Sequence, residues 1–304
     1  MQPKNSSRAI GALLTLGWLW LAAFSTGAAA QEPFERAVVI GGSLTEIAYE
    51  LGVEDRIIAV DTTSVWPPEA LQDKPDVGYM RALSPEGVLA LDPDLVLALS
   101  GAGPPTTFDI LEQAGATIVT VPEGYTPAAI AEKIRIVAEV FGEEEAGAAL
   151  AERVTTEIAE VETALEAVTE PKSVLFVFSF ASGRIVAAGQ ETGADAIITL
   201  AGGVNAMTGF TGYVPVSDEA VTAAAPDIVL AMQNAGPEDV TDAVFELPAL
   251  SQTPAGETQS FISFDGQYML AFGPRTASAI RDVALALYPE LAPVLLPETE
   301  SVAE

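Results

Sequence analysis

Cysteine and histidine are both absent from this 304-residue sequence. Without cysteine, the chain can form no disulfide framework and carries no thiol for a lipid anchor. Without histidine, Ser-His-Asp and Cys-His catalysis are excluded, and so are histidine-based metal sites. Any metal centre in this chain is therefore expected to use oxygen ligands.

Basic residues are scarce as well. The sequence has 13 Lys and Arg against 43 Asp and Glu, a formal net charge of −30 at pH 7. Phosphate backbones are held by Lys and Arg, so this balance excludes nucleic acid as a partner. It also disfavours binding to anionic membrane surfaces.

The first thirty residues have the three parts of a secretory signal peptide. Lys4 and Arg8 make a short positive start, residues 10–24 are an uncharged and mostly apolar run, and residues 28–30 are a small-residue cleavage site. The apolar run, of about 15 residues, is short against the roughly 20 that a membrane anchor needs. We therefore predict cleavage near Ala30, export to the periplasm and no stable membrane insertion afterwards.

Short apolar runs then alternate with helical segments, a pattern typical of βαβ units. Residues 37–40 predict a buried strand, and residues 56–60 predict the next one. Between them, Ser43 and Glu46 form a capping-box pattern that predicts the start of a helix, which Gly52 ends. The Gly41-Gly42 pair matches no phosphate-binding motif, and we interpret it as a turn.

An internal repeat divides the chain. Residues 83–99 align without gaps with residues 216–232, and nine of 17 positions are identical. Each copy predicts a Ser N-cap, a short helix, a Pro-Asp turn and a buried strand. Because the copies lie about half the chain apart, they predict two lobes of similar α/β design.

A long helical pattern connects the two copies. Apolar residues from Leu150 to Val168 recur at steps of three and four, which predicts one helix of about 25 residues, roughly 38 Å long, that ends before Pro171. A rigid connecting helix predicts small hinge motion. The predicted fold is α/β, with two Rossmann-like lobes whose parallel-rich sheets are joined by this single long helix and whose cleft holds the ligand.

The predicted boundaries follow from these features. We place the signal peptide at 1–30, the N-terminal lobe at 31–141, the connecting helix at 142–170, the C-terminal lobe at 171–296 and a disordered acidic tail at 297–304. A last helix is predicted over residues 274–287, with apolar residues on one face.

Tyr79 and Arg81 precede the first copy of the repeat. If this segment is extended, residues two apart point the same way, so a phenol and a guanidinium would share one face as a ligand-binding pair. A surface tyrosine beside a solvated arginine is the more ordinary interpretation. The residues alone leave both interpretations open.

The segment 76–91, with its Gly-Tyr-x-Arg-x-Leu-Ser run at residues 78–84, resembles the periplasmic haem-binding proteins of bacterial haem ABC importers. The same resemblance is carried, in order, by residues 41–47, 201–206, 212–217 and 272–276. The run at 78–84 is the most specific piece, whereas the repeat is shared with the broader group of cobalamin and siderophore binders.

This resemblance implies that Tyr79 is the axial ligand of ferric haem, with haem b as the transported ligand. Phenolate is a hard oxygen donor suited to ferric iron, and iron and a nearby cation both favour it. Arg81 would bind the phenolate oxygen or a propionate through its planar fork. Tyr213 would line the cleft by packing or supply a sixth ligand, and Arg275 would reach a propionate or cap the last helix.

One departure from the family concerns the second lobe. Some members have a histidine after its first strand, where this chain reads Ser179-Phe180-Ala181-Ser182-Gly183. A histidine from the second lobe is therefore excluded as an iron ligand. We predict five-coordinate ferric haem on Tyr79, or a sixth ligand from water or Tyr213, and binding of two haems is put in doubt.

Glu86 and Glu219 occupy equivalent positions in the two copies of the repeat. In similar binding proteins one glutamate on each lobe docks onto arginines of the permease, so the resemblance implies an ABC permease with its ATPase as partner. An acid in the first turn of a helix is the plainer interpretation. The chain is expected to be a monomer and not an enzyme.

The sequence leaves three other functions open: a related binding protein, a haem enzyme, and an inert adhesion or stress protein of the same fold. A cobalamin or ferric-siderophore binder of the same class would use aromatics and arginines without Tyr79 as a ligand. A haem enzyme could also use a tyrosine ligand, but the absence of a distal histidine and the two-lobe repeat argue against it.

Overall fold

The computed structural model describes residues 34–181, 184–233 and 244–296. The predicted signal peptide at 1–30 and the predicted tail at 297–304 lie outside these ranges. Within the described ranges, no helix is long and apolar enough to cross a membrane.

Sheet A is built from four strands, all of them parallel, in the order β2-β1-β3-β4. Its strands are β1 (Ala37–Ile40), β2 (Ile57–Val60), β3 (Leu95–Leu99) and β4 (Thr117–Val121). The central strands β1 and β3 are buried along their whole length, as apolar runs covered on both faces should be. The strands predicted at 37–40 and 56–60 are confirmed.

Five helices surround sheet A: α1 (Gly42–Glu50), α2 (Pro68–Asp73), α3 (Pro85–Leu89), α4 (Pro105–Gln113) and α5 (Pro127–Phe141). A short 3-10 turn spans Glu54–Arg56. The predicted capping box at Ser43 and Glu46 is wrong. The N-cap of α1 is Gly41, no side chain caps the helix, and both Ser43 and Glu46 are buried. A carboxylate that pairs elsewhere in the fold cannot also reach back to cap its own helix.

The internal repeat is confirmed in structure. Ser84 and Ser217 both cap short helices, α3 and α8 (Asp218–Ala224), by accepting a hydrogen bond from the third residue beyond. The aspartates of the two Pro-Asp turns also match. Asp94 accepts from the backbone N–H of Arg36 just before β1, and Asp227 accepts from that of Ser173 at the start of β5. Each unit thus fastens its strand to the neighbouring parallel strand.

Sheet B is mixed, in the order β10-β9-β5-β6-β8, with β7 pairing with β5. Its strands are β5 (Ser173–Ala181), β6 (Arg184–Ala188), β7 (Val204–Asn205), β8 (Tyr213–Pro215), β9 (Ile228–Met232) and β10 (Phe261–Phe264). The strands β10, β9 and β5 run parallel, whereas β6 is antiparallel to both β5 and β8. Side chains on β5 alternate between two cores, because Val174 and Phe176 face one and Leu175 and Val177 face the other.

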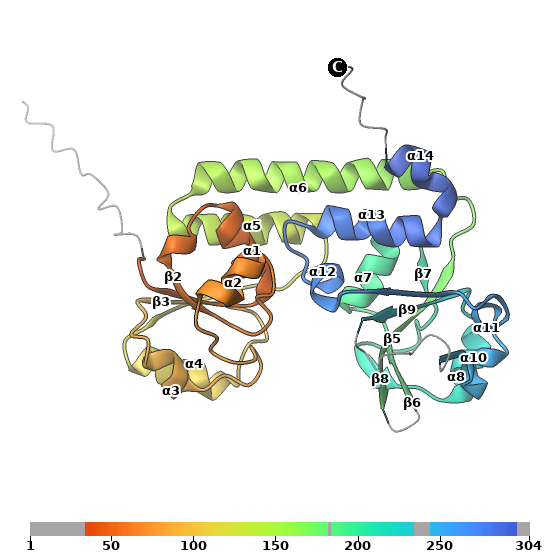
Figure 1. Cartoon of the computed structure of the whole chain (residues 1–304), viewed down its shortest axis with the longest axis horizontal. Helices are drawn as coiled ribbons and strands as arrows, with labels where there is room; N and C mark the ends of the chain where they lie inside the picture. The colour runs from red at the N-terminus through yellow and green to blue at the C-terminus, as the bar shows by residue number, and fades with distance from the viewer. Residues whose placement is uncertain (1–33, 182–183, 234–243, 297–304) are drawn as a thin grey trace, which may run out of the picture. The chain divides into compact units, whose positions relative to one another are not determined.

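Helix α6 (Glu144–Leu165) has 22 residues and packs against both α5 and α13 (Figure 1). At 1.5 Å per residue it is roughly 33 Å long, somewhat shorter than predicted because it ends at Leu165. The other helices are α7 (Gly193–Leu200), α10 (Pro248–Ser251), α11 (Pro254–Thr258), α12 (Gly266–Leu270), α13 (Thr276–Leu287) and α14 (Ala292–Leu295), with a 3-10 turn at Pro289–Leu291. Helix α13 confirms the last helix predicted from the sequence.

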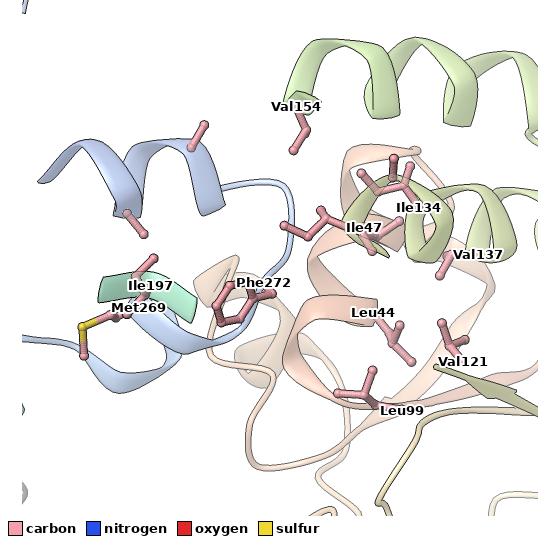
Figure 2. Packing of buried hydrophobic residues seen from close by; sticks show 14 of the residues in the cluster. Leu44, Ile47, Leu99, Val121, Ile134, Val137, Val154, Ile197, Met269 and Phe272 are labelled. Carbon is pink, nitrogen blue, oxygen red and sulfur yellow. The ribbon is translucent and has the colours of Figure 1, made fainter. Parts of the chain in front are cut away.

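We call β1 through α5 the first lobe and β5 through α13 the second lobe. One apolar core runs through both of them. Figure 2 shows Phe272 with Ile197 and Met269 of the second lobe on one side and with Ile47 and Leu44 of α1 on the other. Because close-packed interiors resist deformation, this shared core favours the small hinge motion expected of a rigid connection.

Candidate functional site

A cavity of about 390 Å³ opens at the carboxyl ends of the parallel strands of both sheets. Ligands of open α/β sheets bind at this edge, and the volume is within the usual range of 300–1,000 Å³ for small-molecule sites. Both lobes contribute, so the predicted cleft is present. Its lining residues are Gly42, Ser43, Thr63, Tyr79, Met80, Arg81, Leu99, Glu123 and Tyr125 from the first lobe, and Phe178, Gly193, Tyr213, Met232, Gln233, Asp265, Gly266, Gln267, Leu270 and Ala271 from the second.

Tyr79 and Arg81 lie together on the cavity wall. Their segment is a turn, closed by a hydrogen bond from the Ala82 N–H to the Tyr79 carbonyl (2.8 Å), rather than an extended strand. Met80 between them is buried, and its carbonyl accepts from the Gly103 N–H at 2.9 Å. Anchoring of Met80 leaves Tyr79 49% exposed and turns Arg81 toward the same space.

Two further tyrosines face this space. Tyr213, on β8, packs its ring on Phe178 with 4.7 Å between centroids, and Tyr125 follows β4 and packs on Phe272 at 4.9 Å. Burial raises the pKa of Tyr213, and burial together with the nearby Glu123 raises the pKa of Tyr125 to about 12. At neutral pH both phenols therefore keep their protons and can donate hydrogen bonds.

Charge in the cavity is mixed. Of the described residues that line it, Arg81 is the one cation, and Glu123 and Asp265 are the acids. Arg81 forms no ion pair with any described residue, but it lowers the pKa of both Tyr125 and Tyr213, opposing the effect of burial, so its guanidinium lies near these phenols. A negatively charged ligand group would meet Arg81 and two phenol donors together.

A buried carboxylate, Asp61, holds the segments that carry the lining residues Gly42 and Thr63. Asp61 is fully buried and accepts from the Gly41 N–H (2.8 Å), the Thr63 N–H (3.0 Å) and the hydroxyls of Thr63 and Ser64. Gly42 lies so close to this loop that a Cβ on it would come within 2.3 Å of the Thr63 carbonyl. This close approach fixes the start of α1 against the loop that follows β2.

Arg275 is placed outside the set of residues that line the cavity. It sits at the N-cap position of α13, where its side chain makes no capping bond, so the capping alternative is wrong. Its Nε instead lies 3.1 Å from Oε2 of Glu46, and its guanidinium stacks over the rings of Trp66 and Tyr268. Its contact with a ligand stays a prediction.

Glu86 and Glu219 are both exposed in the first turns of α3 and α8. Hydrogen bonds from its own backbone N–H and from the Ser84 hydroxyl lower the pKa of Glu86, and the same two contacts, with Ser217, lower that of Glu219. Glu86 and Glu219 are therefore charged at neutral pH and lie in equivalent settings, one on each lobe.

Sequence reasoning missed several of the residues that shape this site. Glu123 and Tyr125 lie shortly after the end of β4, and Met232 is the last residue of β9. The rule that ligands bind at the carboxyl ends of parallel strands could have identified them. Phe178 lies inside a strand, with no signal of its own. Glu46 is an acid whose buried partner, Arg275, lies far along the chain, whereas Asp61 is bound mostly by Thr63 and Ser64 close to it in sequence.

Comparisons with known proteins agree with this architecture. Residues 38–268 match the family of periplasmic binding proteins, and the chain belongs to this family. The similar solved structures include two periplasmic haem-binding proteins. The periplasmic haem-binding protein BhuT, in complex with two haems, is 39% identical with a TM-score of 0.79, covering 84% of this chain and 99% of its own. The periplasmic haem-binding protein RhuT from Roseiflexus sp. RS-1, in apo form, is 36% identical with a TM-score of 0.80 and the same coverage.

A curated relative points to a different ligand. The vitamin B12-binding protein of Vibrio campbellii (strain ATCC BAA-1116) is 29% identical over 221 residues, which cover 71% of this chain and 77% of the relative. Both kinds of relative are solute-binding proteins.

Proposed function

We propose that this chain is an exported periplasmic binding protein that binds haem in its interlobe cleft and delivers it to an ABC permease with its ATPase. The observation that carries the proposal is the pair of Tyr79 and Arg81, both presented to the cavity by a turn whose middle residue is buried. The similarity to BhuT and RhuT supports the same ligand class.

The iron ligand in this proposal is the Tyr79 phenolate. The chain has no histidine or cysteine, so oxygen is the hard donor available to ferric iron. Among the described residues, no group of three or more acidic side chains is placed to hold a bare metal ion. Iron would therefore arrive with its own equatorial ligands, as the porphyrin of haem provides.

The propionates would be bound by Arg81 and the two protonated phenols. Arg81 offers a planar pair of donors, and Tyr125 and Tyr213 keep their O–H groups at neutral pH. Local donors matter here because the chain as a whole repels anions. The apolar side chains of Phe178, Leu270 and Met232 would cover porphyrin faces.

A sixth iron ligand, if there is one, would be water or Tyr213. The raised pKa of Tyr213 opposes formation of its phenolate, so we assign Tyr213 to packing and hydrogen bonding. Non-catalytic binding, a monomeric state and free diffusion after signal cleavage near Ala30 complete the proposal. Glu86 and Glu219 would dock the two lobes onto basic groups of the permease.

Titration of the apoprotein with hemin tests this function. A saturable transition to a high-spin tyrosinate spectrum is expected for the wild type. The variant Tyr79→Phe lacks the phenol oxygen and should lose that spectrum. It should also bind hemin at least about tenfold more weakly, because no oxygen of residue 79 is left to bind the iron. Tyr213→Phe is the matched control and should keep the spectrum.

The second candidate is a cobalamin binder, which the vitamin B12-binding relative favours. Titration with cyanocobalamin in parallel separates the two. Saturable binding of cyanocobalamin without a spectral change on hemin addition would replace haem as the ligand.

A further inference from the structure

Lys133, on α5, is a buried cation that joins the two lobes. It is only 1% exposed, although lysine is rarely buried in proteins and is scarce in this sequence. Its Nζ donates to the carbonyl of Phe272 in the second lobe at 3.1 Å and to the hydroxyl of Ser43 on α1 at 3.4 Å. A single ammonium group thus holds three segments, at the start of α1, on α5 and before α13.

A second charged contact lies beside the first. Glu46 of α1 is 2% exposed, and its Oε1 accepts from the Arg275 N–H at 2.8 Å while its Oε2 lies 3.1 Å from Nε of Arg275. Burial raises the pKa of Glu46 and Arg275 opposes this effect. Gly273 sits between the two contacts, where an added Cβ would lie within 3.5 Å of Ser43 and Glu46. The backbone of the second lobe therefore comes into direct contact with α1.

Both contacts are continuous with the walls of the cavity. Ser43, which Lys133 holds, lines the cavity itself. Phe272, whose carbonyl Lys133 holds, packs on Tyr125, another lining residue. The preceding residues Leu270 and Ala271 also line the cavity. The bonds of Lys133 therefore join segments of the two lobes that border the cavity.

Stability alone does not account for charged groups at this position. Buried ion pairs are commonly replaced by apolar residues with no loss of stability, because their attraction barely offsets the loss of hydration. Phe272, Ile47 and Met269 supply close-packed apolar contacts around these groups (Figure 2). Hydrogen bonds add a defined direction to that packing, because they depend on angle and apolar contacts do not.

We propose that Lys133 and the Glu46–Arg275 pair are positioning residues that fix the angle between the lobes and thereby set how long a ligand stays in the cleft. The effect on haem rests on the function proposed above, whereas the effect on the lobes does not. Neither group touches iron in this proposal.

The test measures distances between the lobes in the apoprotein. Because the chain has no cysteine of its own, Glu112→Cys on α4 and Glu257→Cys on α11 give two exposed sites for spin labels, one on each lobe. Lys133→Met and Glu46→Gln are then compared with the wild type, and Lys172→Met, at an exposed lysine, is the matched control.

We expect broader interlobe distance distributions for Lys133→Met and Glu46→Gln, and an unchanged one for Lys172→Met. Hemin should dissociate about tenfold faster from the first two, since affinity changes within one site act mostly on dissociation, while the tyrosinate spectrum stays the same. A change in stability alone would lower the melting temperature without broadening distances well below it.

Distance distributions of both variants that coincide with the wild type would overturn the proposal. If Lys133→Met does not fold, Glu46→Gln decides alone, because Gln keeps the bond to the Arg275 N–H. If the wild type binds no hemin, the proposed function fails, and the distances still decide whether these residues position the lobes.

Discussion

Burial of Lys133 makes the free energy of unfolding of this protein change with pH in the alkaline range. Burial lowers the pKa of Lys133 from 10.5 to about 8, and the nearby carboxylates Glu123 and Glu46 only partly oppose this effect. Arg275, paired with Glu46, is a further charge in the neighbourhood. The unfolded chain keeps the ordinary value. Between pH 8 and 10.5 the unfolded state therefore holds a proton that the folded state has lost.

Under these conditions the free energy of unfolding rises with pH. The gap between the two pKa values corresponds to about 3 kcal/mol when the whole interval has been crossed. Tyrosines whose pKa is raised by folding, such as Tyr125 and Tyr268, act in the opposite direction above pH 10. Their contribution is shared by wild type and variant, so it cancels in a comparison.

Urea unfolding of wild type and Lys133→Met from pH 7 to 10 measures this effect. The difference in unfolding free energy, wild type minus variant, should move in favour of the wild type by about 2–3 kcal/mol over this range. Parallel pH profiles, with a constant difference, would refute the lowering of the Lys133 pKa by burial.

Three further predictions concern the cavity and the docking residues. Gly42→Ala should lower the free energy of unfolding by about 1–3 kcal/mol and weaken hemin binding, because the added Cβ would clash with the Thr63 carbonyl. Gly87→Ala is the control and should be tolerated, because its Cβ would make only ordinary contacts. Thermal melts and hemin titrations of both variants measure these effects. Asp61→Asn should lower the free energy of unfolding by about 3 kcal/mol, because the N–H groups of the amide would face the N–H and O–H groups that now donate to Asp61. Urea unfolding measures this loss, and Asp73→Asn, at an exposed aspartate, is the control. Charge reversal of Glu86 and Glu219 together should abolish uptake by the reconstituted permease and leave hemin binding unchanged; intact uptake would refute their role in docking.

The fold was largely predictable because it is encoded locally and twice. Ser84 and Ser217 cap their helices, and Asp94 and Asp227 bind the neighbouring strands. Each copy of the repeat therefore contains the residues that define its own helix and strand. The mixed character of sheet B was not foreseen. Strands β6 and β8 are short and partly exposed, and their antiparallel pairing depends on β5 rather than on a local pattern.

The site was predictable only in part. Tyr79 and Arg81 lie near each other in sequence, and a short motif was enough to select them. The Glu46–Arg275 contact joins residues 229 positions apart, and nothing near Glu46 distinguishes it from a helix-capping acid. Tertiary packing determines which residues pair across such a separation, so the sequence near Glu46 wrongly predicted a capping box. For the same reason the sequence did not predict the burial of Lys133, whose partner Phe272 is also far along the chain.

The central claim is that the Tyr79 phenolate binds the iron of haem, and resonance Raman spectroscopy of the hemin complex tests it most directly. Enhanced tyrosinate vibrations are predicted for the wild type and for Tyr213→Phe, and they should be absent from Tyr79→Phe. Persistence of these vibrations in Tyr79→Phe, or their loss in Tyr213→Phe alone, would contradict the claim.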